Sequence, residues 1–254
     1  MNKESDRNEE IWRAHANGWI EFSNSGNNIH RDFLDTPKFL EFLPKNVKKL
    51  HALDVGCGDG YNTRLVAKLG VEIIGIDISE GMIEYARNRE DKENLGVKYH
   101  ICNAESLPFS NQEFDFCIAT MSLMDMTHPK EVLEEIYRVL KQGGFFQFSI
   151  LHPCYMTPIR KHIRNSNGIE IALEVGKYFD EGEYEEIWGV EHHAQFKTIH
   201  YHRTLSSWIN MISESKFKIE RVTEPFADEK IIETCPHLEH TRNAPNTIIF
   251  RCRK

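Results

Sequence analysis

Three alternate glycines in the segment LDVGCGDG are the residues best suited to hold a ligand. Gly56, Gly58 and Gly60 follow an apolar run and precede a helical pattern, so they lie where a strand gives way to a helix. Backbone without side chains can close tightly around a bound molecule there. The dinucleotide pattern G-x-G-x-x-G is not met, because Tyr61 takes the third glycine position. Asp54, two residues before the first glycine, suits a positively charged ligand better than a pyrophosphate.

Polar residues also follow the next two apolar runs. Asp77 ends the second run about 20 residues after Gly56, the spacing of a carboxylate that accepts ribose hydroxyls. Asn103, Ala104 and Glu105 follow the third run, where an amide can hydrogen-bond an adenine edge beside an apolar slot. Asp77 as a helix cap and Asn103 as a turn residue are the plainer alternatives. Together at three strand ends, these residues predict a nucleoside site.

The elements that must position these residues follow a βαβ rhythm from position 50 to position 151, which predicts an α/β fold with a parallel sheet. Helical patterns are expected at 63–69, 79–87 and 129–140, and again from Thr204. The seven expected strands are 52–55, 71–76, 97–102, 114–119, 145–151, 217–222 and 246–252.

Four segments divide the chain. Residues 1–45 are expected to form a cap of short helices, the second of which starts with Pro37 at its first position. Residues 46–151 form the core, and 201–254 return to it. Residues 152–200 are rich in His, Tyr, Phe and Glu without a clear period, which predicts an inserted lid. Its aromatic and acidic side chains could select an amine, but a hairpin with one packed face is the simpler interpretation.

Composition limits the partners of the chain. The 254 residues carry a net charge of −8 and contain no long Lys/Arg cluster, which argues against a nucleic-acid partner. No apolar run approaches the ~20 residues that a membrane helix needs. The first ten residues are polar, and the six cysteines form no CxxC pair, so we expect a cytoplasmic protein with reduced thiols.

Four segments of the chain resemble a known family. LDVGCGDG, IIGIDISEGMIEYARN, CNAESLPFSNQEFDFCIA and HPKEVLEEIYRVLKQGGFFQFSI are similar to class I S-adenosylmethionine-dependent methyltransferases, in particular the type 11 branch with its ubiquinone/menaquinone-type small-molecule enzymes. The resemblance implies a Rossmann-like three-layer sandwich. Its seven-stranded sheet would be mostly parallel with the last strand antiparallel. Asn103 departs from the Asp usual in the family, and Gln142 from the usual Pro.

The resemblance also implies roles for individual residues. The glycine loop would wrap the methionine part of S-adenosylmethionine, Asp77 would hold the ribose, and Thr120 and Met121 would face the sulfonium. Arg31, in NNIHRDFLDTP, would meet the cofactor carboxylate. The predicted cofactor-binding residues are Arg31, Asp54, Gly56, Cys57, Gly58, Gly60, Asp77, Ile78, Met82, Asn103, Ala104, Glu105, Thr120 and Met121.

Methyl transfer from a sulfonium needs alignment more than acid–base chemistry, and a base is required only where the acceptor must lose a proton. His152, directly after the fifth strand and near the expected cleft mouth, is the first candidate base, and His202 the second. A structural histidine is the plainer alternative for both. His192-His193 and the pair His200 and His202 lack a partner at ligand spacing, so no metal is expected.

The expected function is therefore methyl transfer to an O, N or C atom of a small molecule, with S-adenosylhomocysteine as the product. A nucleic-acid or protein methyltransferase on the same fold is an alternative, since Pro153-Cys154 resembles the nucleophile motif of cytosine-C5 enzymes. A non-catalytic cofactor-binding subunit is another. A nicotinamide oxidoreductase is disfavoured by Tyr61. The acceptor and the oligomeric state cannot be read from the sequence.

Overall fold

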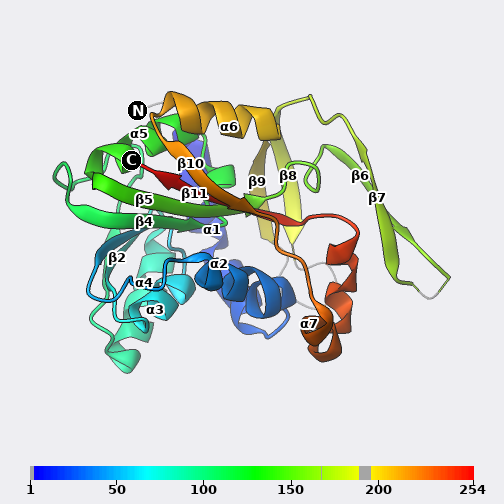
Figure 1. Ribbon diagram of the computed structural model, residues 1–254, viewed down its shortest axis with the longest axis horizontal. Helices are drawn as coiled ribbons and strands as arrows, with labels where there is room; N and C mark the ends of the chain where they lie inside the picture. Colours follow the sequence, from blue (N-terminus) through cyan, green and yellow to red (C-terminus); the bar gives the residue numbers. More distant parts are fainter. Residues whose placement is uncertain (1–2, 167, 189–195) are drawn as a thin grey trace.

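The computed structural model describes residues 3–166, 168–188 and 196–254, and shows one seven-stranded sheet (Figure 1). The strand order is β10-β11-β5-β4-β1-β2-β3. β11 runs antiparallel to both of its neighbours, and the other pairs are parallel. This confirms the predicted fold. The strands are β1 (His51–Val55), β2 (Glu72–Asp77), β3 (Lys98–Ile101), β4 (Phe114–Thr120), β5 (Leu140–Leu151), β10 (Lys218–Thr223) and β11 (Thr247–Arg253).

Helices cover both faces of the sheet. Alternation along β1 sends Ala52 into the cluster beneath α2 (Thr36–Phe42), α3 (Tyr61–Ala67) and α4 (Glu80–Glu93). Leu53 and Val55 point to the opposite cluster, beneath α5 (Pro129–Val139) and α6 (Leu205–Glu214). Each fully buried large side chain contributes about 1.5–3 kcal/mol to this sandwich. The two packed faces hold the sheet rigid, so the strand ends have fixed positions.

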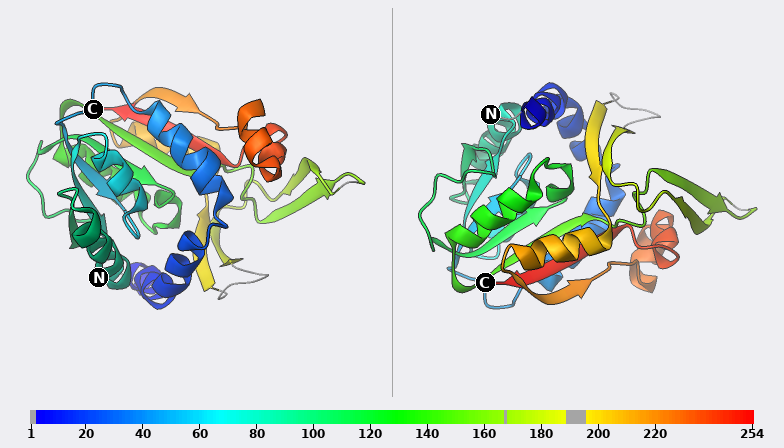
Figure 2. Two further views of the ribbon diagram at one scale, coloured as in Figure 1. Left: turned by 90° about the horizontal axis from the view of Figure 1, so that it is seen from below. Right: turned by 90° about the horizontal axis from the view of Figure 1, so that it is seen from above.

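The N-terminal cap differs from the prediction of short helices. α1 (Lys3–Asn24) is a single helix of 22 residues, followed by the π-helical turn η1 (Arg31–Asp35) and then α2. Pro37 lies at the start of α2, as expected. α1 packs on α4 and on β9, a strand of the insertion, and Figure 2 shows it along one side of the molecule. Its partners lie far away in sequence, so they could not be foreseen.

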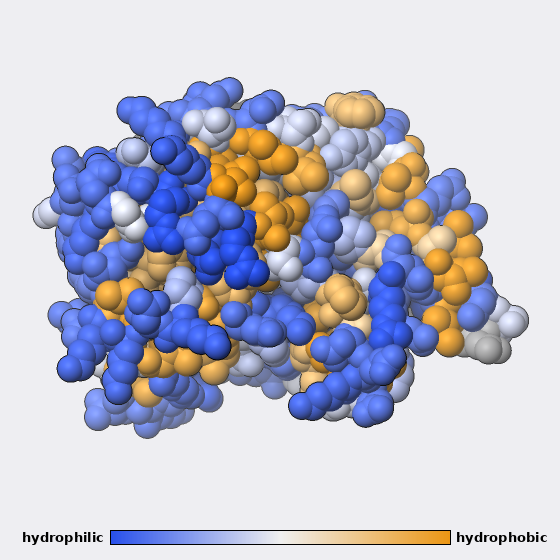
Figure 3. Space-filling model, viewed as in Figure 1, coloured by the Kyte–Doolittle hydropathy of each residue, from blue (hydrophilic) through white to orange (hydrophobic). Residues whose placement is uncertain are grey.

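The insertion forms two hairpins. β6 (Ile159–Arg164) pairs with β7 (Glu170–Gly176), and β8 (Gly182–Trp188) pairs with β9 (Phe196–His202), so the second hairpin ends two residues after position 200. The β6–β7 hairpin projects from the molecule (Figure 1) and carries apolar side chains such as Ile159, Ile171 and Val175 on its surface (Figure 3). The β8–β9 hairpin lies under α1.

Three short helical segments complete the chain. η2 (Leu123–Asp125) follows β4, while α7 (Glu229–Thr234) and η3 (Pro236–Arg242) lie between β10 and β11. The last two were not predicted, and Leu238 packs with Leu34 of η1 in a small separate cluster. Within the described residues, no helix combines the length and apolar character needed to cross a bilayer.

Candidate functional site

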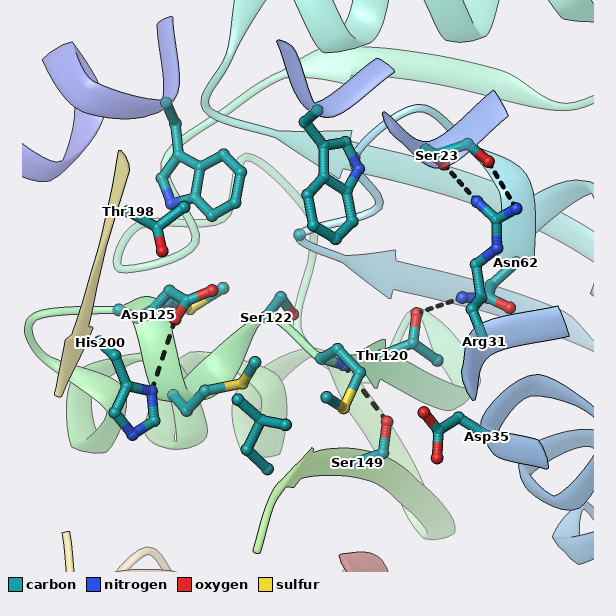
Figure 4. A pocket seen from close by; sticks show the side chains of 18 of the residues that line it. Ser23, Arg31, Asp35, Asn62, Thr120, Ser122, Asp125, Ser149, Thr198 and His200 are labelled. Carbon is teal, nitrogen blue, oxygen red and sulfur yellow. Dashed lines mark hydrogen bonds and ion pairs between the residues drawn. The ribbon is translucent and has the colours of Figure 1, made fainter. Parts of the chain in front are cut away.

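A cavity of about 560 Å³ opens at the carboxyl ends of β1, β2, β3 and β4. α1 and η1 form one wall, while η2, β8 and β9 form another, so the cap and the insertion together cover the strand ends. This is the edge where open parallel sheets bind ligands, and the volume lies within the ~300–1,000 Å³ range of small-molecule sites. Figure 4 shows Arg31 and Ser23 at one end of the cavity and Asp125 and His200 at the other.

The three glycines after β1 share a left-handed backbone but differ in what surrounds them. All have left-handed φ angles, +69° at Gly56, +54° at Gly58 and +73° at Gly60. A Cβ on Gly56 would lie 2.6 Å from Cβ of Ser122, and one on Gly60 would lie 2.6 Å from the hydroxyl of Tyr99. A Cβ on Gly58 meets no atom within 4 Å. Gly56 and Gly58 line the cavity, whereas Gly60 caps α3 behind it.

Asp77 lies at the end of β2 and lines the cavity, beside Gly58. Its two carboxylate oxygens accept hydrogen bonds from the backbone N–H groups of Gly58 and Ser79, each at 2.9 Å. Burial raises the pKa of Asp77, and these N–H groups oppose that effect. Each carboxylate oxygen has further lone pairs, so Asp77 can also accept hydrogen bonds from ligand hydroxyls.

Asp54 does not lie where it was expected. Its carboxylate is fully buried below the glycine loop, does not line the cavity, and accepts a 2.7 Å hydrogen bond from the hydroxyl of Thr63. Burial raises its pKa to about 7. Alternation along β1 puts the side chain under α3, and this corrects its assignment to the ligand. Asp59, which was not predicted, lines the cavity instead.

Arg31 and Asp59 are joined through Ser23. The Arg31 guanidinium hydrogen-bonds the Ser23 hydroxyl and donates to the Ser23 carbonyl at 2.7 Å, while the hydroxyl donates to Asp59 at 3.0 Å. The guanidinium also lies 4.0 Å from the centre of the Tyr61 ring. A cation and a carboxylate at one end of a cavity can hold the carboxylate and the ammonium of an amino acid.

The other predicted nucleoside residues meet at the ends of β2 and β3. Ile78, Met82, Asn103, Ala104 and Glu105 all line the cavity. Oδ1 of the Asn103 side chain accepts the Glu105 N–H at 2.8 Å, which leaves the side-chain amide nitrogen as the donor to a ligand. The Glu105 carboxylate lies 3.0 Å from Nδ1 of His128. A donor beside apolar side chains suits the ring nitrogen of an adenine.

Thr120 and Met121 end β4 in the middle of the cavity wall. The Thr120 hydroxyl accepts a 3.0 Å hydrogen bond from Asn62, whose amide oxygen accepts one from Thr36 at 2.9 Å. Met121 has a left-handed φ of +53° and donates its N–H to the Ser149 carbonyl at 3.0 Å. Such a backbone conformation costs about 1 kcal/mol or more in a non-glycine residue and is typical of functional sites. Asn62 was not predicted.

Asp35 is a partly buried carboxylate that lines the cavity. Thr247 donates to it at 2.9 Å, and burial raises its pKa to about 7. Figure 4 shows Asp35 near the Arg31 end. Sequence reasoning saw it only as part of a helix start.

His152 and His202 are both outside the cavity, which corrects the expectation that His152 lies at its mouth. His152 is only 3% exposed, and its Nε2 lies 3.0 Å from the Glu224 carboxylate, while Nδ1 accepts the Cys154 N–H. Nε2 of His202 hydrogen-bonds the Tyr178 carbonyl at 2.8 Å. Their side chains support the insertion.

The described part of the chain holds no cluster of three or more His, Cys, Asp or Glu side chains that could bind a metal. The segment His192-His193 lies outside the described residues. His200, which was considered only for metal, lines the cavity with Asp125 of η2. Trp12 and Trp19 of α1 line it too, and were missed because nothing in their spacing shows what α1 covers.

The comparisons with known proteins agree with this geometry. The family described as a methyltransferase domain matches residues 53–148, which include the glycine loop and Asp77. A solved S-adenosylmethionine-dependent methyltransferase from Mesorhizobium loti superposes with a TM-score of 0.74 at 25% identity, covering 86% of this chain and 96% of that one. Residues 53–148 are therefore a methyltransferase domain of the class I S-adenosylmethionine-dependent type.

Two curated relatives match mainly the core of the chain. A ubiquinone biosynthesis O-methyltransferase from Coxiella burnetii is 30% identical over 121 residues, 47% of this chain and 52% of the relative. A biotin biosynthesis bifunctional protein from Cellvibrio japonicus is 29% identical over 124 residues, 49% of this chain and 24% of the relative. The chain therefore spans about a quarter to a half of the length of these relatives.

The chemistry of the residues that line the cavity fits S-adenosylmethionine. The open space at Gly58 accommodates a ligand where any side chain would intrude, and Asp77 beside it offers a carboxylate to a ribose. Arg31 and Asp59 have the charges complementary to a methionine carboxylate and ammonium. The contacts of these individual residues with the cofactor are predictions.

Proposed function

We propose that the protein transfers a methyl group from S-adenosylmethionine to a small-molecule acceptor by in-line displacement. The observation that supports the proposal is that one cavity is lined both by the loop around Gly58 and by an apolar wall that includes Met124 and Met126. When bound, the cofactor supplies an electrophilic methyl group on its sulfonium. Arg31, Asp59 and Asp77 would hold it, and the wall would orient the acceptor. Orientation alone lowers such a barrier by about 7–11 kcal/mol.

A hydroxyl on an apolar ring is the acceptor that this wall fits best. Trp12, Trp19, Met124, Met126 and Leu151 all line the cavity, and the two indole rings lie 6.0 Å apart in an edge-to-face contact. Flat apolar molecules pack well against such side chains. The named activity of the Coxiella burnetii relative, O-methylation in ubiquinone biosynthesis, also favours an oxygen acceptor.

A nucleic-acid acceptor receives less support. Cys154, the residue of the Pro-Cys motif, does not line the cavity, and burial raises the pKa of its thiol. A thiolate nucleophile requires a lowered pKa. The net charge of −8 also opposes phosphate binding.

The proposal is tested by incubating the protein with methyl-labelled S-adenosylmethionine and a mixture of small metabolites, RNA and protein. We expect label in the small-molecule fraction and stoichiometric S-adenosylhomocysteine. Label confined to macromolecules would favour the alternative, and binding of the cofactor without any turnover would favour a non-catalytic subunit.

A further inference from the structure

His200 and Asp125 lie close together at the end of the cavity opposite Arg31 (Figure 4). Nδ1 of His200 lies 3.9 Å from Oδ1 of Asp125. β9 of the insertion provides the histidine, and η2, just after β4, provides the carboxylate. Both residues line the cavity, and His200 is only 6% exposed. The fold therefore brings together two ionisable groups from segments 75 residues apart at the acceptor end of the site.

We infer that His200 is the general base that takes the proton of the acceptor hydroxyl, and that Asp125 is its positioning residue. This inference rests on the proposed function. Nδ1 is buried, and the side chain lines the cavity. A carboxylate on the Nδ1 side favours the tautomer with the proton on Nδ1, which leaves the lone pair on Nε2.

The distance between the two groups is longer than a hydrogen bond but within the range of an ion pair. Such contacts are often long without substrate and shorten when the site is filled. The Arg203 guanidinium also lies near Asp125 and donates to the Met126 carbonyl at 3.0 Å. Burial raises the pKa of Asp125, while His200 and Arg203 oppose this effect. A carboxylate held between two cations can stabilise the imidazolium that forms.

The surroundings suit proton transfer away from bulk water. Figure 4 shows Ser122 and Thr120 between this pair and the Arg31 end, and Thr120 is one of the two residues predicted to face the sulfonium. Trp12 and Trp19 of α1 line the same cavity and restrict solvent there. An acceptor in this space has its reacting oxygen between His200 and β4.

The step balances without a further reactant. The O–H bond of the acceptor breaks and its proton goes to Nε2 of His200. The electron pair on the oxygen forms the new O–CH₃ bond, and the pair of the broken C–S bond stays on sulfur as a thioether. The imidazolium later returns its proton to solvent.

Phenols of graded acidity distinguish a base from a structural histidine. 4-Methylphenol must lose its proton, whereas 4-nitrophenol is largely ionised at pH 8. With both probes and S-adenosylmethionine, His200→Gln should lower kcat for 4-methylphenol by about 100-fold or more but for 4-nitrophenol by less than about 5-fold. Asp125→Asn should show the same selectivity with a smaller loss and little change in KM. The control is the same substitution at a histidine outside the cavity, His51→Gln, at the start of β1.

A second readout is independent of turnover. In the presence of S-adenosylhomocysteine, 4-nitrophenol bound near pH 6 should show more of the phenolate absorbance with the wild-type protein than with His200→Gln. Equal losses for both phenols, or equal absorbance, would overturn the inference. So would an absence of transfer to any phenol by protein that binds S-adenosylhomocysteine. Failure to bind S-adenosylhomocysteine at all would instead contradict the proposed function.

Discussion

Asp77 is the residue whose loss should affect the nucleoside site most directly. We expect Asp77→Ala to weaken S-adenosylhomocysteine binding by about 1–3 kcal/mol, because ribose hydroxyls and two backbone N–H groups would lose their acceptor. Calorimetric titration measures the change. Asp91→Ala, an exposed position on the helix after Asp77, is the control. Equal affinities of Asp77→Ala and wild type would remove Asp77 from the site.

Gly58 can be compared with a second glycine, Gly96, which also has a left-handed φ but lies outside the cavity. Gly58→Val should abolish S-adenosylhomocysteine binding by projecting a side chain into the cavity. Gly96→Val is the matched control, since Gly96 has a φ of +84°, meets no atom within 4 Å and lies outside the cavity. Both variants carry similar backbone strain. If both bind the product equally, the loop around Gly58 does not hold it.

The sequence could predict which residues line the cavity where the direction of a side chain follows from the end of a strand. Asp77, Asn103 and Thr120 line the cavity because each lies at the carboxyl end of a parallel strand. Asp54 failed because it lies within β1, where alternation buries it. Of the two histidines on β9, only His200 lines the cavity. The sequence could not show this, because His202 is held by the distant Tyr178 carbonyl.

At the scale of elements, the start of α6 joins the insertion to the core. Oγ of Thr204 accepts the Ser207 N–H at 3.2 Å and donates to Glu181 at 2.7 Å. Thr204→Ala should lower the free energy of unfolding by about 1–2 kcal/mol, because it removes the helix cap and this link together. Urea unfolding followed by circular dichroism measures it. Thr204→Ser keeps the hydroxyl and should retain most of the stability. A loss as large in Thr204→Ser would show that the methyl group, rather than the cap, is responsible.

The sheet and its flanking helices could be predicted because each has a local pattern. α5 shows apolar residues on one face, and β11 is a short strand that is buried along most of its length. α1 and the two hairpins have no such pattern, because their stability comes from contacts with segments far away in the sequence. α1 and both hairpins contribute residues to the cavity lining, which is why that part of the lining was the least predictable.

For the whole molecule, buried carboxylates set a pH dependence of stability. Burial raises the pKa of Asp54 from 3.8 to about 7, so the folded chain binds more protons than the unfolded chain between these values. The free energy of unfolding should therefore fall as pH rises through this window. Asp35 acts in the same direction.

Asp54→Asn isolates one contribution, because an amide can still accept the Thr63 hydroxyl. Its stability should fall less than that of the wild type between about pH 4 and about pH 7, as measured by urea midpoints across this range. Asp91→Asn, at an exposed site, should follow the wild-type curve. Parallel curves for Asp54→Asn and wild type would mean that the Asp54 carboxyl titrates alike in the folded and unfolded chains.

The measurement that tests the central claim most directly is calorimetric titration of the purified protein with S-adenosylhomocysteine and, separately, with NAD. The account predicts saturable binding of S-adenosylhomocysteine at one site per chain and no heat of binding for NAD. Binding of NAD in preference to S-adenosylhomocysteine, or no binding of S-adenosylhomocysteine, would contradict it.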